Sequence, residues 1–242
     1  MNKKIEGLVI SEQDYKESSK IIKVLTSDGI ISIIAKGSRK LKSNDRNSTS
    51  KITLSSFNII YKEDGLSTLT DSDIINSYKN IKKDIIKISY ASYLLDLASQ
   101  VMKQNNNKDI YNLLVDSLNK IEEGFSSIVI TNILELKYLD YLGVMPIIDE
   151  CSICGTKNSI ATISGKDGGY ICNNCLTNQP IVDEKTIKLI RMFYYVDISK
   201  ISKLEISDKI KNEINTFLDD YYDKYTGLYL KTKSFLKNLN KL

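Results

Sequence analysis

The chain has 242 residues, with no histidine, no tryptophan, two prolines and four cysteines. The absence of histidine excludes Ser-His-Asp and Cys-His catalysis and any histidine-ligated metal site. The 34 Lys and Arg against 30 Asp and Glu leave a net charge of +4, too small to indicate nucleic-acid binding unless basic residues cluster locally.

The N-terminus predicts no export signal, because Lys3, Lys4 and Glu6 place charges where a signal peptide needs an apolar run. The sequence contains no stretch of about 18 consecutive apolar residues, so we expect no transmembrane helix and no membrane partner. Four cysteines without an export signal indicate a reducing compartment, where metal binding is more common than disulfide formation. We therefore expect a cytoplasmic protein.

Residues 1–80 are predicted to form a small β-barrel domain. Short runs rich in Ile, Val, Leu and Thr are separated by turn formers such as Ser27-Asp28-Gly29 and Glu63-Asp64-Gly65. Five short strands fit a closed barrel better than a sandwich, which usually has about seven strands. The predicted strands span residues 5–10, 20–25, 30–35, 52–61 and 66–70.

Beyond residue 80 the apolar residues recur at spacings of three and four, which predicts helices. We expect a helical domain in two parts, residues 81–146 and 181–242, whose apolar stripes form its core. The first stripe consists of Ile81, Ile85, Ile88, Ala91, Leu95, Ala98 and Met102.

Polar residues mark the expected starts of the later helices. Asp109 and Ser126 are the predicted N-caps of the second and third helices, because short polar side chains accept hydrogen bonds from the first turn. Gly143 is predicted to end the third helix. Two further helices are expected to begin at Asp183 and Ser207.

All four cysteines fall in residues 147–180, between the two parts of the helical domain. They form two C-x2-C pairs, each of which can bring two thiolates to one tetrahedral zinc ion. A site of four cysteines is closed, so we expect a structural zinc ion, one per chain, and no catalytic metal. Disulfides and metal-free thiols are the alternatives. The predicted ligands are Cys151, Cys154, Cys172 and Cys175.

A basic segment at residues 36–51 is the predicted nucleic-acid site. It carries a single acid, Asp45, and small polar residues fill the spaces between its cations. We expect a flexible loop whose cations bind phosphates, as loops on oligonucleotide-binding barrels do. A solvated surface loop without a ligand is the alternative. The predicted contacts are Lys36, Arg39, Lys40, Lys42, Arg46 and Lys51.

A second basic run closes the chain, and no acid follows Asp223. Aromatic residues are interleaved with its lysines, so the run could extend a nucleic-acid path or bind an acidic peptide. A frayed terminus is the alternative. The run comprises Lys224, Tyr225, Tyr229, Lys231, Lys233, Phe235, Lys237 and Lys241.

The sequence predicts a binding protein and not an enzyme. It contains no G-x-x-x-x-G-K-[ST] phosphate loop and no G-x-G-x-x-G motif. The pair Asp71 and Asp73 is too weak a pattern to predict a magnesium site. We therefore assign no catalytic residue.

Several segments, in order, resemble the RecO family of bacterial DNA repair proteins. Beside the cysteines, the resemblance rests on residues 14–22, 35–40, 65–69, 139–146 and 227–236. The chain departs from the family pattern at Ser55-Ser56, where a proline is usual. The resemblance covers nearly the whole chain.

The resemblance implies an α+β multidomain fold, in which an N-terminal OB-fold barrel precedes an α-helical domain with an inserted zinc module. It also implies a recombination mediator that binds single- and double-stranded DNA and anneals strands coated by single-strand-binding protein (SSB). Expected partners are DNA, RecR and SSB; RecA loading with RecR and nucleoid association on DNA are also implied. The alternative is a zinc-stabilised protein–protein adaptor or transcription-associated factor without annealing activity.

Overall fold

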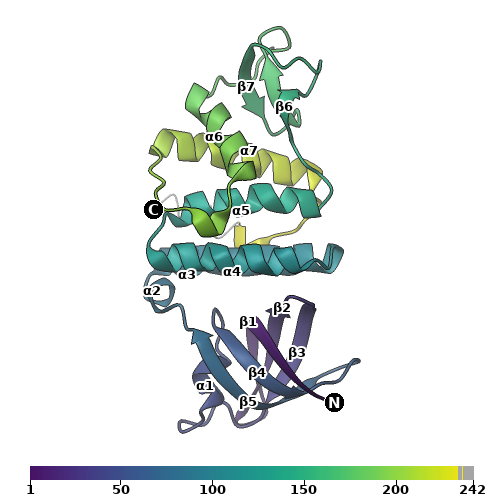
Figure 1. Cartoon of the computed structure of the whole chain (residues 1–242), viewed down its shortest axis with the longest axis vertical. Coiled ribbons are helices and arrows are strands. Elements are labelled where there is room, and N and C mark those ends of the chain that lie inside the picture. The colour runs from purple at the N-terminus through teal and green to yellow at the C-terminus, as the bar shows by residue number, and fades with distance from the viewer. Residues whose placement is uncertain (234–235, 237–242) are drawn as a thin grey trace. The chain divides into compact units, whose positions relative to one another are not determined.

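The computed structural model describes residues 1–233 and residue 236 (Figure 1). The chain divides into two compact units. The first unit comprises residues 1–124 together with the C-terminal residues from Leu230 onward, and the second comprises Phe125–Tyr229. The boundaries expected at residues 80, 146 and 180 stay a prediction.

The first unit begins with a closed barrel of five strands in the order β1-β2-β3-β5-β4. All neighbouring strands are antiparallel except β3 and β5, which pair in parallel only at Ile33–Ser67 and Ile34–Thr68. The expected barrel is confirmed. Its strands are β1 (Asn2–Tyr15), β2 (Ser19–Thr26), β3 (Gly29–Ala35), β4 (Leu54–Ile60) and β5 (Ser67–Asn76).

The barrel is filled by alternate apolar side chains of its strands, including the fully buried Ile22, Ile33 and Phe57. Gly7 lies where β1 passes closely over β2. A Cβ atom there would lie 2.3 Å from Val24 Cγ1. The absence of a side chain at Gly7 therefore permits the close pairing of the two strands.

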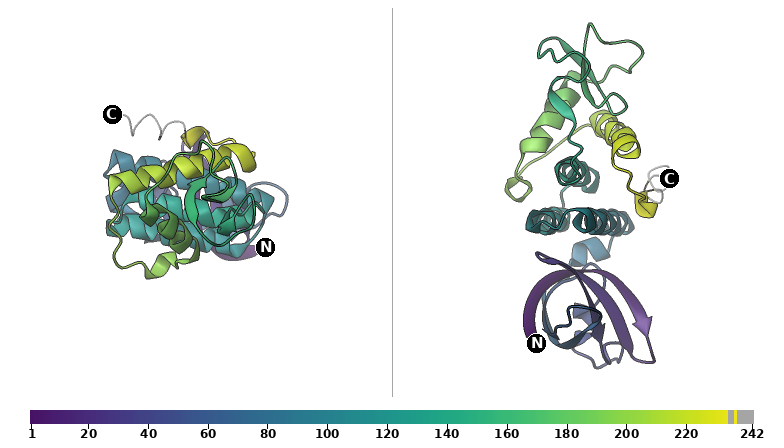
Figure 2. Two further views of the ribbon diagram at one scale, coloured as in Figure 1. Left: turned by 90° about the horizontal axis from the view of Figure 1, so that it is seen from above. Right: turned by 90° about the vertical axis from the view of Figure 1, so that its right-hand side faces the viewer.

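The first unit also contains the helices α2 (Lys79–Lys82), α3 (Ile85–Gln104) and α4 (Lys108–Glu123). The stripe predicted from residue 81 is interrupted between α2 and α3, because the Asp84 side chain caps α3 by accepting from the backbone N–H groups of Ile86 and Lys87. Glu122 of α4 accepts from the backbone N–H groups of Asn80 and Ile81, which ties α2 to α4. Helix α3 contacts β1 and β3, and α4 contacts β2 (Figure 2).

The second unit contains a small sheet of β6 (Ile147–Cys151), β8 (Gly169–Cys172) and β7 (Ile160–Ser164), in that order, and two of its helices contact this sheet. Helix α5 contacts both α6 and α7. The helices are α5 (Ser127–Tyr141), α6 (Glu184–Tyr195) and α7 (Asp208–Tyr225), with a 3-10 turn, η1 (Ile198–Lys200), between the last two.

The helix starts expected from the sequence are found within one or two residues, but not every predicted cap is used. Asp109 is not the cap of α4; Asn107 is, and its side chain accepts from the backbone N–H of Asp109. Ser126 occupies the N-cap position of α5 without a side-chain hydrogen bond. Asp183 caps α6 by accepting from Lys185.

In the described part of the chain, no helix is both long enough and apolar enough to span a bilayer.

Candidate nucleic-acid interface and metal centre

The basic segment lies between β3 and β4, and its second half is packed against the barrel. It contains a one-turn helix, α1 (Asp45–Ser48), which contacts β5. Ser48 Oγ lies 2.7 Å from Ser72 Oγ of β5, and both hydroxyls are buried. Ser72 Oγ in turn donates to Asp45 Oδ1 at 2.5 Å. The Ser48 hydroxyl of the basic segment is therefore used inside the protein.

Five of the six predicted cations are exposed on this segment. Arg39 is one of them, and the other four are Lys36, Lys40, Lys42 and Arg46. None of the four forms an ion pair with any residue that the structure describes. Phosphates could therefore approach them without first displacing a carboxylate.

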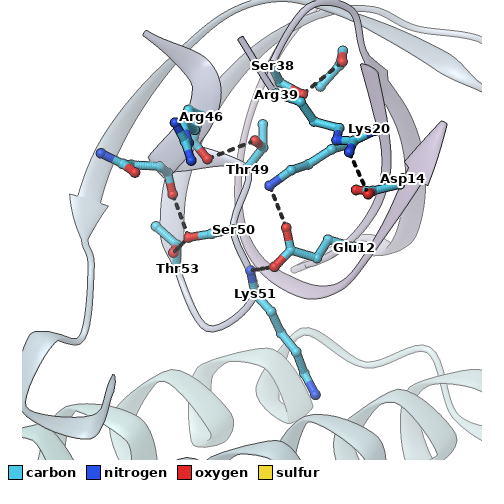
Figure 3. A network of polar contacts seen from close by, with 12 residues as sticks. Glu12, Asp14, Lys20, Ser38, Arg39, Arg46, Thr49, Ser50, Lys51 and Thr53 are labelled. Carbon is cyan, nitrogen blue, oxygen red and sulfur yellow. Dashed lines mark hydrogen bonds and ion pairs between the residues drawn. The ribbon is translucent and has the colours of Figure 1, made fainter. Parts of the chain in front are cut away.

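Arg39 is held differently, although it is partly exposed. Its Nη2 forms an ion pair with Asp14 Oδ2 at 3.0 Å, and its Nη1 donates to the backbone carbonyls of Lys16 and Glu17 at 3.4 Å (Figure 3). The guanidinium thus closes the turn between β1 and β2. Its charge is already balanced by Asp14.

Lys51 points away from the other predicted contacts and toward the helices (Figure 3). Its Nζ donates to Ser92 Oγ of α3 at 3.3 Å, and its backbone N–H donates to Glu12 Oε1 at 3.2 Å. Burial lowers the pKa of Lys51, and the charges of Asp96 and Glu12 only partly oppose this. The structure does not bring Lys51 together with the exposed cations.

Lys82 of α2 contacts the sequence neighbours of Lys51, which local sequence patterns do not predict. Its Nζ donates to Thr53 Oγ1 at 2.7 Å and to Ser50 Oγ at 3.4 Å. Burial also lowers the pKa of Lys82. An isolated lysine on a short helix carries no local signal, because its contact depends on residues about 30 positions away.

The basic run expected at the C-terminus is divided between the two units. Lys224 belongs to the second unit, where its Nζ donates to the carbonyl of Lys166. Lys231 and Lys233 belong to the first unit. Phe235, Lys237 and Lys241 lie outside the described residues.

The four cysteines come together in the second unit, where their Sγ atoms all lie within 4.8 Å of one another. The Sγ atoms of Cys154 and Cys172 are 3.7 Å apart. Tetrahedral coordination with four bonds of about 2.3 Å places neighbouring sulfurs about 3.8 Å apart. The cluster therefore fits a metal ion bound by four thiolates.

The backbone around the cluster favours the charged form of one ligand. Burial alone would raise the pKa of Cys151, but the backbone N–H groups of Cys154, Cys172 and Ile153 outweigh it and lower the pKa to about 6. Gly155 follows the first pair with a φ of +74° and donates to the carbonyl of Cys151. This turn aims backbone donors at the sulfur, which stabilises a thiolate.

Comparison with known proteins finds the same relatives for both halves of the chain. Residues 1–78 match the family described as Recombination protein O N terminal, and residues 82–234 match Recombination protein O C terminal. A DNA repair protein RecO from Bacillus pumilus is 34% identical over 245 residues, covering 99% of this chain and 95% of the relative. The DNA repair protein RecO of Bacillus cytotoxicus is 33% identical, covering 100% and 99%. That of Listeria innocua is 32% identical, covering 98% and 95%.

Proposed function

The chain belongs to the RecO family of DNA repair proteins, and from this we propose that it is a DNA-binding recombination mediator. The observation that carries the proposal is a closed barrel with four exposed cations on one segment, none of them ion-paired to a residue that the structure describes. Small barrels of this kind bind nucleic acid through loops that present cations to the phosphates. The chain would be nucleoid-associated when bound to DNA.

Binding at this segment is electrostatic. Each cation that neutralises a phosphate of a single strand releases counterions and contributes about −0.7 to the slope of log K against log salt. Lys36, Lys40, Lys42 and Arg46 together would contribute about −3. Contacts of this kind carry no base specificity, as a protein that acts on any exposed strand requires.

The activity we propose is annealing of complementary strands, including strands coated by SSB. Together with RecR, the protein would load the RecA recombinase on SSB-coated DNA. No catalytic residue is needed, because binding the phosphates of two strands reduces the repulsion that keeps them apart. In this proposal the protein acts by position and charge alone.

An annealing assay with SSB-coated complementary oligonucleotides tests the proposal. We expect the protein to accelerate annealing, and we expect high salt to remove the effect. A protein that leaves the rate unchanged would instead fit an adaptor, in which the barrel binds another protein. A variant with Ala at Lys36, Lys40 and Lys42 is the matched negative control.

We further propose that the four cysteines hold one structural zinc ion per chain. The thiolate ligands are the type that zinc prefers, and the closed set leaves no position for a substrate. The ion would cross-link β6, the turn after it and β8, and its binding free energy would stabilise the folded unit.

Metal analysis of a Cys172→Ser variant tests the zinc site. The wild type should contain one zinc ion per chain, and the variant should lose most of it together with thermal stability, because three ligands bind zinc more weakly than four. Asn174→Ser is the matched control, since Asn174 is exposed in the same turn. Full zinc content in the Cys172 variant would contradict the assignment.

A further inference from the structure

Two half-buried lysines connect the basic segment with the helices: Lys51 reaches α3, and Lys82 reaches from α2 to the neighbours of Lys51. Lys82 Nζ donates to the hydroxyls of Ser50 and Thr53, on either side of Lys51 in the sequence. Lys51 Nζ donates to the hydroxyl of Ser92. All three acceptors are uncharged. Within the described part of the chain, neither lysine has an ion pair with a carboxylate.

The carboxylates nearest to these lysines are occupied by other donors. Glu12 accepts from Lys20 Nζ at 2.5 Å and from the backbone N–H of Lys51. Asp96 accepts from Gln100 Nε2 at 3.1 Å and from Thr232 Oγ1 at 2.8 Å. Partly desolvated cations without a paired anion gain stability when an anion arrives. The surroundings of Lys51 and Lys82 therefore favour the binding of a phosphate.

The contact between Thr232 and Asp96 also brings the C-terminal segment onto α3. Asp96 lies four residues after Ser92, so the contact is one helical turn, about 6 Å, from the hydroxyl that Lys51 reaches. Lys233 Nζ lies 5.9 Å from the centre of the Tyr93 ring on the same stretch of helix. The C-terminal segment that carries Lys233 thus contacts the same stretch of α3 that Lys51 reaches, although more than 130 positions separate Thr232 from Asp96 in the sequence.

We propose that Lys51, Lys82, Lys231 and Lys233 form a phosphate-binding strip on α3, hereafter the α3 strip, which continues the DNA path of the barrel. The proposal rests on DNA binding by the barrel and extends it: a single strand held by the basic segment runs onto the α3 strip instead of ending at the barrel. Lys51 is the link, because it follows the basic segment in the chain while its side chain lies on α3.

With the α3 strip, the binding site is longer than the site on the barrel alone. Oligonucleotides of different length therefore distinguish binding by the barrel alone from binding by the barrel and the strip. One barrel of this type covers about 4–16 nucleotides. We would measure the salt dependence of binding for oligo(dT) of about 8 and about 30 nucleotides, using the whole chain. The variant carries Lys82→Gln, Lys231→Gln and Lys233→Gln. On the long strand its slope should be flatter than that of the wild type by about 2, and on the short strand it should change much less.

A matched control removes the same charge from the second unit, by Lys188→Gln, Lys200→Gln and Lys203→Gln. All three lysines are exposed and ion-paired to nearby acids. The control should keep the wild-type slope on both strands. If the triple variant of the strip does not fold, the double variant Lys231→Gln and Lys233→Gln should flatten the slope on the long strand by about 1.4.

The outcomes separate the strip from the proposed function. Suppose that the wild type binds both strands and that the strip variant has the same slope on the long strand as the control. This result overturns the α3 strip, whereas DNA binding by the barrel still stands. A wild type that binds neither strand overturns both proposals.

Discussion

Arg39 and its neighbours Lys36, Lys40 and Lys42 have similar charges in the sequence but different surroundings in the structure. The guanidinium of Arg39 is bound by Asp14 and by two backbone carbonyls, whereas the three lysines are exposed and unpaired among the described residues. A phosphate at Arg39 would have to compete with Asp14. The lysines, not the arginine, should therefore dominate the salt dependence of DNA binding.

This difference leads to a prediction for two variants. Replacing Lys36, Lys40 and Lys42 by Ala should flatten the slope of log K against log salt on a short single strand by about 2, since each lost contact removes about 0.7. Arg39→Ala should flatten it by clearly less than 0.7 for its one charge. Fluorescence anisotropy at several salt concentrations measures both slopes. An equal change in slope per removed charge in the two variants would show that Arg39 leaves Asp14 and binds a DNA phosphate.

At the scale of elements, the junction between α2 and α3 sets where the half-buried lysines lie. Asp84 ends the preceding turn and caps α3, and Glu122 holds the first backbone N–H groups of α2. The apolar spacing alone predicts one continuous helix from residue 81. These two carboxylates instead stabilise a break between α2 and α3. Lys82 consequently lies on a short helix of its own, directed at the barrel hydroxyls.

The cap at Asp84 gives a stability prediction. Asp84→Ala removes the acceptor for two backbone N–H groups and should lower the free energy of unfolding of the first unit by about 1 kcal/mol. Urea unfolding of the whole chain measures the change. Lys83→Ala is the matched control, because Lys83 is exposed and adjacent but caps no N-terminus. Equal midpoints for Asp84→Ala and the wild type would contradict the assigned role.

At the scale of the whole molecule, the basic segment and the cysteine cluster lie in different compact units. The cations that we propose as DNA contacts are all in the first unit, and the cysteines that we propose as metal ligands are all in the second. Neither site borrows a residue from the other unit. A metal ion at the cysteines would therefore stabilise its own unit without shaping the barrel.

Removal of the metal should affect the stability of the second unit and not DNA binding by the first. We expect a chelator to lower the temperature at which the second unit unfolds, because the free energy of metal binding is then lost from its folded state. Binding of a short oligo(dT) should keep its affinity and its salt slope. Adding zinc back is the control for reversibility. A loss of DNA affinity in proportion to the lost metal would contradict this independence.

The sequence by itself determined the parts of this protein that depend on local pattern. The five barrel strands follow from short β-rich runs between turn formers, and the helices follow from apolar residues at spacings of three and four. The C-x2-C spacing determined each half of the cysteine cluster, since two residues between the cysteines of a pair can already place two sulfurs together. These features need no knowledge of distant contacts.

Only the tertiary structure decided which cations share a site. It paired Arg39 with Asp14, directed Lys51 to α3, placed Lys82 beside it and brought Thr232 to Asp96 across 136 positions of sequence. The physical reason is that a side chain's partner is set by packing between elements, which local spacing does not encode. The position of a charge along the chain is thus visible in the sequence, but whether that charge is free to meet a phosphate is decided by the fold.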